Sequence, residues 1–266
     1  MTLHVLDFWK ATGLDDVVEL LPILVVGVAA GTVFGLFGAG GSAFATPMLV
    51  LAGVPPVFAI ATPLPALLPA SLAGAHRYLR AGNLDRRVAT LAVAGGLPGT
   101  IVGALASALV SGSWLVLLSG FLLLVVGARV LLPDPAGHGA RCDARRERTP
   151  AVMAVAFAVG LLTGLLANGG GFLLVPAFVL LLGLSAAVAS GTSMVAVGFL
   201  AIPTLLVHWQ LGHIDWPVAL VFGVGLLPGS LLGARAAQRI PADRARHAFG
   251  VLLVVFATWF LARQVL

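Results

Sequence analysis

Long uncharged stretches dominate the pattern of polar and apolar positions along this chain. Asp, Glu, Lys and Arg are absent between Glu19 and Arg77, between Arg87 and Arg129, and between Arg148 and Asp215. Each stretch can hold one or more membrane-spanning helices of about 20 residues. In the first half of the chain we therefore predict helical segments at 20–37, 42–52, 55–79, 88–110 and 114–132. The prolines of Thr62-Pro63-Leu64-Pro65 predict a kink or an unwound turn near the start of the third segment.

Composition supports the same fold class. Hydrophobic residues make up 60% of the 266 residues and charged residues 9%, whereas soluble domains carry about 25% charged residues. We therefore predict an all-α, polytopic integral membrane protein that has the lipid bilayer as a partner. The net charge of +5 comes from arginines in short loops beside apolar spans, which is the positive-inside pattern and does not indicate nucleic-acid binding.

The two halves of the chain repeat each other. Gly35, Leu36, Gly40, Gly41 and Pro47 recur 129 positions later, and Gly53, Thr62, Gly82 and Asp85 recur 130 positions later. Matches of Gly, Pro, Thr and Asp are more informative than matches of Leu. We predict a lead over 1–19, a first membrane repeat over 20–132, a linker over 133–150 and a second repeat over 151–266. Each repeat then has about five helical segments, or 8–10 transmembrane segments in all, some of them short or broken.

Arginines in equivalent loops predict that the repeats are inverted. The turn after the third segment of the first repeat holds Arg80, Arg86 and Arg87, whereas its counterpart holds no Lys or Arg. The bias reverses at the next turn, where the arginines, Arg235 and Arg239 among them, belong to the second repeat. Loops 80–87, 133–150 and 235–246 should therefore be cytoplasmic and both termini on the outer side of the membrane.

A glycine-rich break interrupts an apolar run in each repeat, at Gly38-Ala39-Gly40-Gly41-Ser42 and at Ala167-Asn168-Gly169-Gly170-Gly171. If helices begin at Ser42 and Gly171, their free N–H groups and positive dipole ends point into the breaks. Two such ends facing each other would bind a small oxyanion near the bilayer midplane. The candidate substrate-binding residues are Gly40, Gly41, Ser42, Thr62, Asn168, Gly169, Gly170, Gly171, Thr192 and Ser193.

Two plainer interpretations of these residues stay open. Glycines such as Gly27, Gly31 and Gly35, which recur every four residues, are typical of close helix packing. Thr62 and Thr192 would serve equally well as caps for a helix freed by neighbouring prolines. A bulky replacement of Gly41 or Gly170 separates these interpretations, because it should abolish transport without preventing membrane insertion.

Enzyme and metal chemistry have little support in the sequence. HExxH and CxxC motifs are missing, the six histidines are dispersed, and the only cysteine is Cys142, so no cofactor or metal ion is expected. Because the predicted spans contain no carboxylate, a buried proton relay through Asp or Glu is excluded, and a cationic substrate would lack its counter-charge. An anion leaving a negative-inside cell gains about 2.3 kcal/mol per charge per 100 mV, which is enough to export it without a coupling ion.

Three repeated motifs resemble those of the sulfite exporter TauE/SafE family. They are the glycine breaks, the Gly-x-(Leu/Ile)-Asp turns at 82–85 and 212–215, and the Pro-Gly-(Thr/Ser)-x-x-Gly-Ala motifs at 98–104 and 228–234. The resemblance covers about residues 20–265. It implies a bacterial inner-membrane transporter of sulfite, sulfoacetate or related small sulfur oxyanions.

The runner-up functions are an anion channel and a membrane scaffold or assembly protein without transport. The sequence leaves open the ligand, the coupling ion and the direction of transport. It also leaves open whether the chain forms a homodimer and whether segments 42–52 and 172–182 cross the membrane fully.

Overall fold

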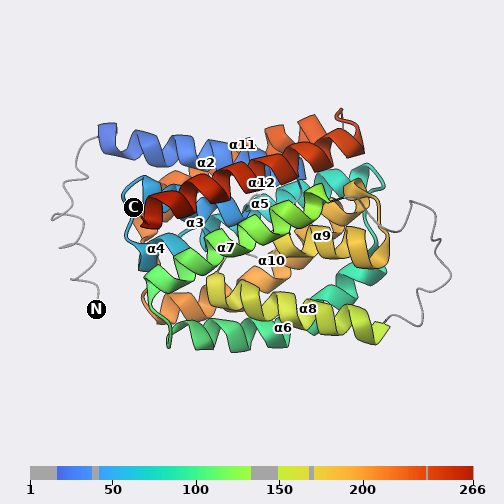
Figure 1. Ribbon diagram of the computed structural model, residues 1–266, viewed down its shortest axis with the longest axis horizontal. Coiled ribbons are helices and arrows are strands. Elements are labelled where there is room, and N and C mark those ends of the chain that lie inside the picture. Colours follow the sequence, from blue (N-terminus) through green and yellow to red (C-terminus); the bar gives the residue numbers. More distant parts are fainter. Residues whose placement is uncertain (1–16, 38–41, 133–148, 168–170, 238, 266) are drawn as a thin grey trace.

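The computed structural model describes residues 17–37, 42–132, 149–167, 171–237 and 239–265, and these residues form helices joined by short turns, without a β-strand among them (Figure 1). The helices of the first half are α2 (Val17–Phe37), α3 (Ser42–Leu51), α4 (Pro56–Ala61), α5 (Leu64–Arg80), α6 (Arg86–Ser107) and α7 (Gly112–Leu131). Those of the second half are α8 (Thr149–Leu166), α9 (Gly171–Leu182), α10 (Ala186–Gln210), α11 (Trp216–Ala237) and α12 (Ala242–Val265).

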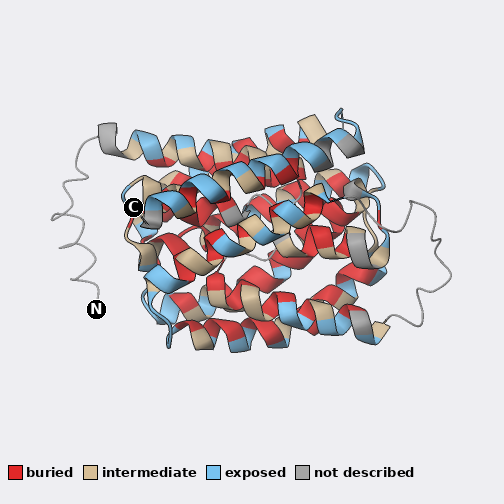
Figure 2. Ribbon diagram, in the orientation of Figure 1, coloured by how far each residue is buried: buried red, intermediate tan, exposed pale blue. Residues whose placement is uncertain are grey.

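The predicted all-α polytopic membrane fold is confirmed. Six apolar helical stretches are long enough to cross a membrane, and Val152–Leu166 and His247–Arg263 are shorter apolar stretches within α8 and α12. Helices suit a bilayer because each satisfies its backbone hydrogen bonds internally. Large apolar side chains cover the outside of the bundle, such as Leu72 and Leu220, which are 67% and 69% exposed. Figure 2 shows these exposed positions along the outer helix faces and the buried positions facing inward.

α3 and α9 are half-length helices. With 10 and 12 residues they measure about 15 and 18 Å, roughly half of the 30 Å hydrocarbon core. Neither helix is long enough to cross the hydrocarbon core by itself. Gly53 and Gly183 follow these helices with φ values of +92° and +66°, the left-handed conformation in which glycine ends a helix. In Figure 1, α3 lies toward one end of the bundle and α9 toward the other.

Helix pairs that match between the two halves make matching contacts. α2 packs along α11 in the same way as α8 packs along α6, and α8 and α6 are the repeat equivalents of α2 and α11. In addition, α7 packs on α12 and α5 packs on α10. Glycines allow the first two pairs to approach closely. A methyl group at Gly27, Gly31 or Gly35 would overlap a backbone carbonyl of α11, and one at Gly160 or Gly164 would overlap a carbonyl of α6. Packing is therefore the role of these glycines.

The course of the chain places both described ends on one side of the bundle. In Figure 1, α2 begins and α12 ends at the left, whereas α7 ends and α8 begins at the right. α2 and α8 thus run in opposite directions, as do α7 and α12. The inverted placement of the two repeats in a membrane stays a prediction.

The third segment is interrupted as predicted. α4 ends at Ala61 and α5 begins at Leu64, so Thr62 and Pro63 separate two helices. The corresponding part of the second half is continuous, since α10 runs from Ala186 to Gln210 with Pro203 inside it. The halves therefore share helix pairing but differ in this segment.

Candidate functional site

The two half-length helices begin at the residues where the sequence predicted helix N-termini. α3 starts at Ser42 and α9 at Gly171, and Gly171 is buried. Five of the predicted site residues lie outside the described residues: Gly40, Gly41, Asn168, Gly169 and Gly170. Each helix start leaves backbone N–H groups without a partner inside the helix.

The first turns of α3 and α9 pack near the middle of the α7–α12 pair. Phe44 in α3 lies 4.9 Å from Phe256 of α12, measured between ring centroids. Phe44 also belongs to a buried apolar cluster with Leu123 from the middle of α7, and Leu173 in the first turn of α9 packs against the same cluster. The helix starts therefore point from opposite halves of the chain toward one central region.

The helices that precede the breaks end far apart. The carbonyl of Phe37 at the end of α2 accepts a 3.2 Å hydrogen bond from the Ser190 hydroxyl. The carbonyl of Gly164 near the end of α8 lies 3.2 Å from Nε2 of His208. Positions 190 and 208 of the continuous helix α10 are about 27 Å apart at 1.5 Å per residue. The ends of α2 and α8 are therefore separated along α10, and Phe37 at the end of α2 belongs to the same apolar cluster as Phe44.

Tyr78 and His208 hold equivalent carbonyls in the two halves. The Tyr78 hydroxyl donates to the carbonyl of Gly35 at 3.3 Å, and His208 contacts the carbonyl of Gly164. The offsets are those of the repeat, 130 for the side chains and 129 for the glycines. This pair was not predictable from the repeat, because a tyrosine matched to a histidine carries no repeat signal. The halves thus anchor the helix before each break with different chemistry.

Thr62 and Thr192 join the two halves of the chain. The Thr62 hydroxyl accepts from the backbone N–H of Asp215 at 3.1 Å, and the Thr192 hydroxyl accepts from the backbone N–H of Asp85 at 3.0 Å. We call these two hydrogen bonds the inter-half clamps. Both threonines are fully buried, and so is Ser193, whose hydroxyl donates to the carbonyl of Ser190 at 2.9 Å.

The capping interpretation of the threonines is not what the structure shows. The residue before α5 is Pro63, which makes no side-chain cap, and Thr192 lies within α10. Side-chain caps occur at other helix starts: the carboxylates of Asp85 and Asp215 accept from the N–H groups of Val88 and Val218 at the starts of α6 and α11. A role of Thr62, Thr192 or Ser193 in binding substrate stays a prediction.

Neutral groups surround the centre of the bundle. The six long spans contain no Asp or Glu, and their arginines lie in terminal turns, for example Arg80, Arg129 and Arg235. Asp215 lies between spans, where burial raises the pKa of its carboxyl group. Among the residues that the structure describes, no three His, Cys, Asp or Glu side chains gather as metal ligands.

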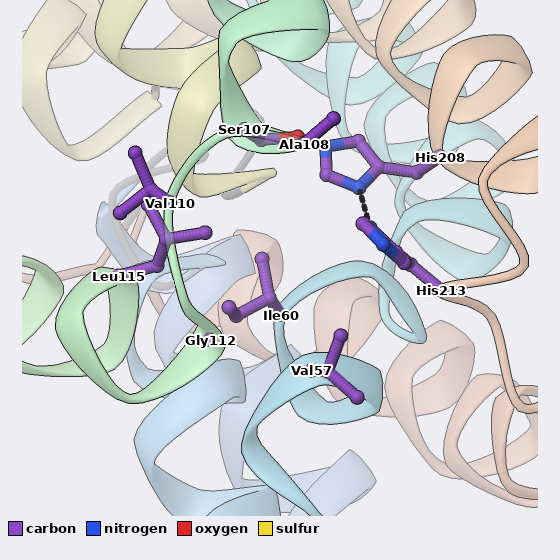
Figure 3. A pocket seen from close by; sticks show the side chains of 9 residues that line it. All are labelled: Val57, Ile60, Ser107, Ala108, Val110, Gly112, Leu115, His208 and His213. Carbon is purple, nitrogen blue, oxygen red and sulfur yellow. Dashed lines mark hydrogen bonds between the residues drawn. The ribbon is translucent and has the colours of Figure 1, made fainter.

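A small cavity of about 60 Å³ lies at one end of the bundle (Figure 3). Residues from α4, from the α6–α7 turn and from the end of α10 line it: Val57, Ile60, Ser107, Ala108, Val110, Gly112, Leu115, His208 and His213. Nδ1 of His208 lies 3.1 Å from Nδ1 of His213. The cavity is separate from the starts of α3 and α9, since none of its lining residues comes from those helices.

Long apolar helices, together with the two half-length helices α3 and α9, define a polytopic α-helical membrane protein. The chain belongs to the sulfite exporter TauE/SafE family, whose family model matches residues 23–260. It is therefore a membrane transporter of that family.

Curated relatives cover nearly the whole chain. A "Probable membrane transporter protein" from Xylella fastidiosa (strain 9a5c) is 31% identical over 92% of this chain and 96% of its own length. The "Probable membrane transporter protein YunE" of Bacillus subtilis (strain 168) is also 31% identical, over 82% of this chain and 87% of its own. The "Probable membrane transporter protein MJ0441" of Methanocaldococcus jannaschii is 23% identical over 91% and 96%. No solved structure matches the chain.

Proposed function

We propose that this chain exports a small sulfur oxyanion, such as sulfite, sulfoacetate or a related organosulfonate, by alternating access. The observation that carries the proposal is the convergence of the first turns of α3 and α9 on the middle of the α7–α12 pair. Two helix N-termini in one low-dielectric region, without a carboxylate in the surrounding spans, favour a negatively charged ligand. The family description names sulfite.

The ligand in this proposal is held by backbone amides. A helix N-terminus carries the equivalent of about half a positive charge and presents N–H groups that have no partner in the helix. Two opposed ends together balance about one negative charge without an arginine or lysine at membrane depth. Glycine at position 171 would allow the anion to approach the backbone directly. The anion would be coordinated by hydrogen bonds and released when the two halves rock apart.

The same proposal includes the direction and the placement in the membrane. The protein would lie in the bacterial inner membrane with its arginine-rich loops in the cytoplasm and both termini in the periplasm. The membrane potential then drives an anion outward by about 2.3 kcal/mol per charge per 100 mV. That force alone suffices for export.

Flux in proteoliposomes tests the proposal. Purified protein is reconstituted and efflux of sulfite, sulfoacetate, sulfate and chloride is measured, with and without a proton gradient. We expect saturable flux that favours sulfur oxyanions. Gly171→Leu should abolish this flux because the side chain fills the space before the first turn of α9. Ala158→Leu, on an exposed position of the neighbouring α8, is the matched control and should transport normally.

Three results would decide against the proposal. Equal, non-saturating leak of chloride and sulfate would indicate an anion channel. Normal flux in Gly171→Leu would remove the helix N-termini from the binding site, and absence of any anion flux in the wild type would favour a scaffold or assembly role.

A further inference from the structure

The cavity beside His208 and His213 has features that the proposed central site does not use. Apart from the two imidazoles and Ser107, its lining residues are apolar or glycine. Figure 3 shows the two rings side by side, with Ala108 near His208 and the apolar side chains around the hollow. A volume of about 60 Å³ accommodates several water molecules or one small anion.

Hydrogen bonds assign the protons of the histidine pair. The Gly164 carbonyl can only accept, so Nε2 of His208 carries a proton and donates to it. When His208 is neutral, its Nδ1 is therefore an acceptor, and Nδ1 of His213 must donate across the 3.1 Å separation. In neutral His213, Nε2 then carries no proton and has a free lone pair. This nitrogen has no hydrogen-bond partner within the described part of the chain.

A further proton has one place to go without breaking these bonds. Nε2 of His213 can accept it while Nδ1 of His213 continues to donate to His208 and His208 continues to hold Gly164. Protonation of Nδ1 of His208 would instead place two N–H groups against each other. The first added proton therefore makes His213 an imidazolium on the cavity wall and leaves the anchor of α8 intact.

The residues around His213 favour the binding of an anion beside the protonated imidazole. Among the described residues, the cavity lining holds no carboxylate. α4 contributes Val57 and Ile60, and the end of α6, the turn after it and the start of α7 contribute Ser107, Ala108, Val110, Gly112 and Leu115. The nearest carboxylate in sequence, that of Asp215, already accepts from the N–H of Val218. Gly112, the first residue of α7, lines the cavity, so a positive helix end faces it as well.

Burial also disfavours the charged form of His213. Removal from solvent lowers the pKa of His213 below its ordinary value of 6.5. An anion in the cavity opposes this effect, because a negative charge nearby stabilises the imidazolium.

We propose that this cavity is a second anion site, which takes up one small oxyanion together with one proton on Nε2 of His213. The inference rests on the proposed anion transport and adds a proton-linked site at the end of the bundle where α10 ends and α7 begins. In the predicted topology this is the periplasmic end, where an exported anion leaves. Tyr78, the equivalent of His208 in the other half, provides no comparable site.

Titration of His213 in the full-length protein tests this site without requiring transport. The protein is labelled with ¹⁵N-histidine in detergent, and the His213 signal is followed against pH with and without sulfite or sulfate. The anion should shift the midpoint to higher pH. Above that midpoint, the affinity of the cavity should fall tenfold per pH unit, because one proton is bound with each anion.

Three variants make the test specific. His213→Gln retains a donor for Nδ1 of His208 but cannot titrate, so its anion response should become independent of pH. Val57→Phe leaves both imidazoles in place and fills the cavity, so it should remove the anion-induced shift. His247→Gln, an exposed histidine on α12, should leave the shift unchanged.

The outcomes separate this inference from the proposed function. An anion that leaves the His213 midpoint unmoved, or an unchanged shift in Val57→Phe, overturns the second site even if transport is observed. A shift that depends on His213 and on the open cavity supports the site even if proteoliposome flux of sulfur oxyanions fails.

Discussion

The inter-half clamps can be tested by replacing each threonine with the isosteric valine. Thr62→Val and Thr192→Val remove the acceptor of the Asp215 or Asp85 backbone N–H and keep the shape of the side chain. An N–H group left without a partner in a buried place costs about 1–3 kcal/mol. The Asp215 bond is buried and the Asp85 bond is partly buried, so Thr62→Val should lie toward the upper part of that range and Thr192→Val toward the lower part.

Unfolding in mixed detergent micelles of increasing SDS content measures these costs. A loss of about 1.4 kcal/mol corresponds to a tenfold change in the folding equilibrium. The serine variants at the same two positions keep the hydroxyl acceptor and serve as matched controls. The two clamps are separated by the length of α5, about 25 Å for its 17 residues, so the double valine variant should show the sum of the single effects.

The kinetic result decides between a structural and a binding role. If the threonines act through the clamps, the valine variants lose stability while the KM for the transported anion is unchanged. Unchanged stability combined with a raised KM in Thr62→Val or Thr192→Val would refute the clamp reasoning and favour direct contact with the substrate.

Two further predictions follow. Burial raises the pKa of Asp215 in the folded protein above its ordinary value of 3.8. The protonated carboxyl group therefore adds stability that is present below pH 3.8 and is lost as the pH rises through the pKa of the folded state. Asp215→Asn should keep the cap on the Val218 N–H, abolish the loss of stability at higher pH and be at least as stable as wild type at pH 7. Asp215→Ala should lose about 1 kcal/mol of stability because the cap is removed. In denaturant titrations, an Asp215→Asn variant that is less stable than wild type contradicts the desolvation argument. Cys142, in the predicted cytoplasmic linker, should react with an impermeant maleimide only after cells are permeabilised, and labelling in intact cells would reverse the topology.

Much of the fold was predictable because membrane helices follow from local composition. The starts of α3 and α9 agree with the glycine breaks at Ser42 and Gly171, and the break between α4 and α5 agrees with Thr62-Pro63. Glycine and proline act on their own backbone and on the next turn, so their effects appear in the sequence. The close packing of α2 was also visible, since glycines every four residues form one face of a helix.

The hydrogen-bonded contacts were less predictable because they join residues distant in the chain. The Thr62 hydroxyl accepts from the backbone N–H of Asp215, 153 positions away, and no local pattern indicates that contact. The pairing of His208 with His213 needs both the end of α10 and the turn after it, in a geometry that no short motif specifies. A hydroxyl or imidazole has several partners available to it, so only the packing of the helices decides which one it binds.

The difference between the pairs Tyr78–Asn83 and His208–His213 would make only one end of the duplicated fold sensitive to protons. Tyr78 and His208 each hold a carbonyl at the end of the helix before a glycine break, so the two halves move against equivalent anchors. In the second site proposed above, the proton is taken by His213, and the equivalent residue of the first half is Asn83, whose side chain does not titrate. Proton-dependent behaviour should therefore arise at the end of the bundle that holds His208 and His213. Tyr78→His together with Asn83→His, which copies the pair onto the opposite end at the equivalent positions, should make transport sensitive to pH on that side as well.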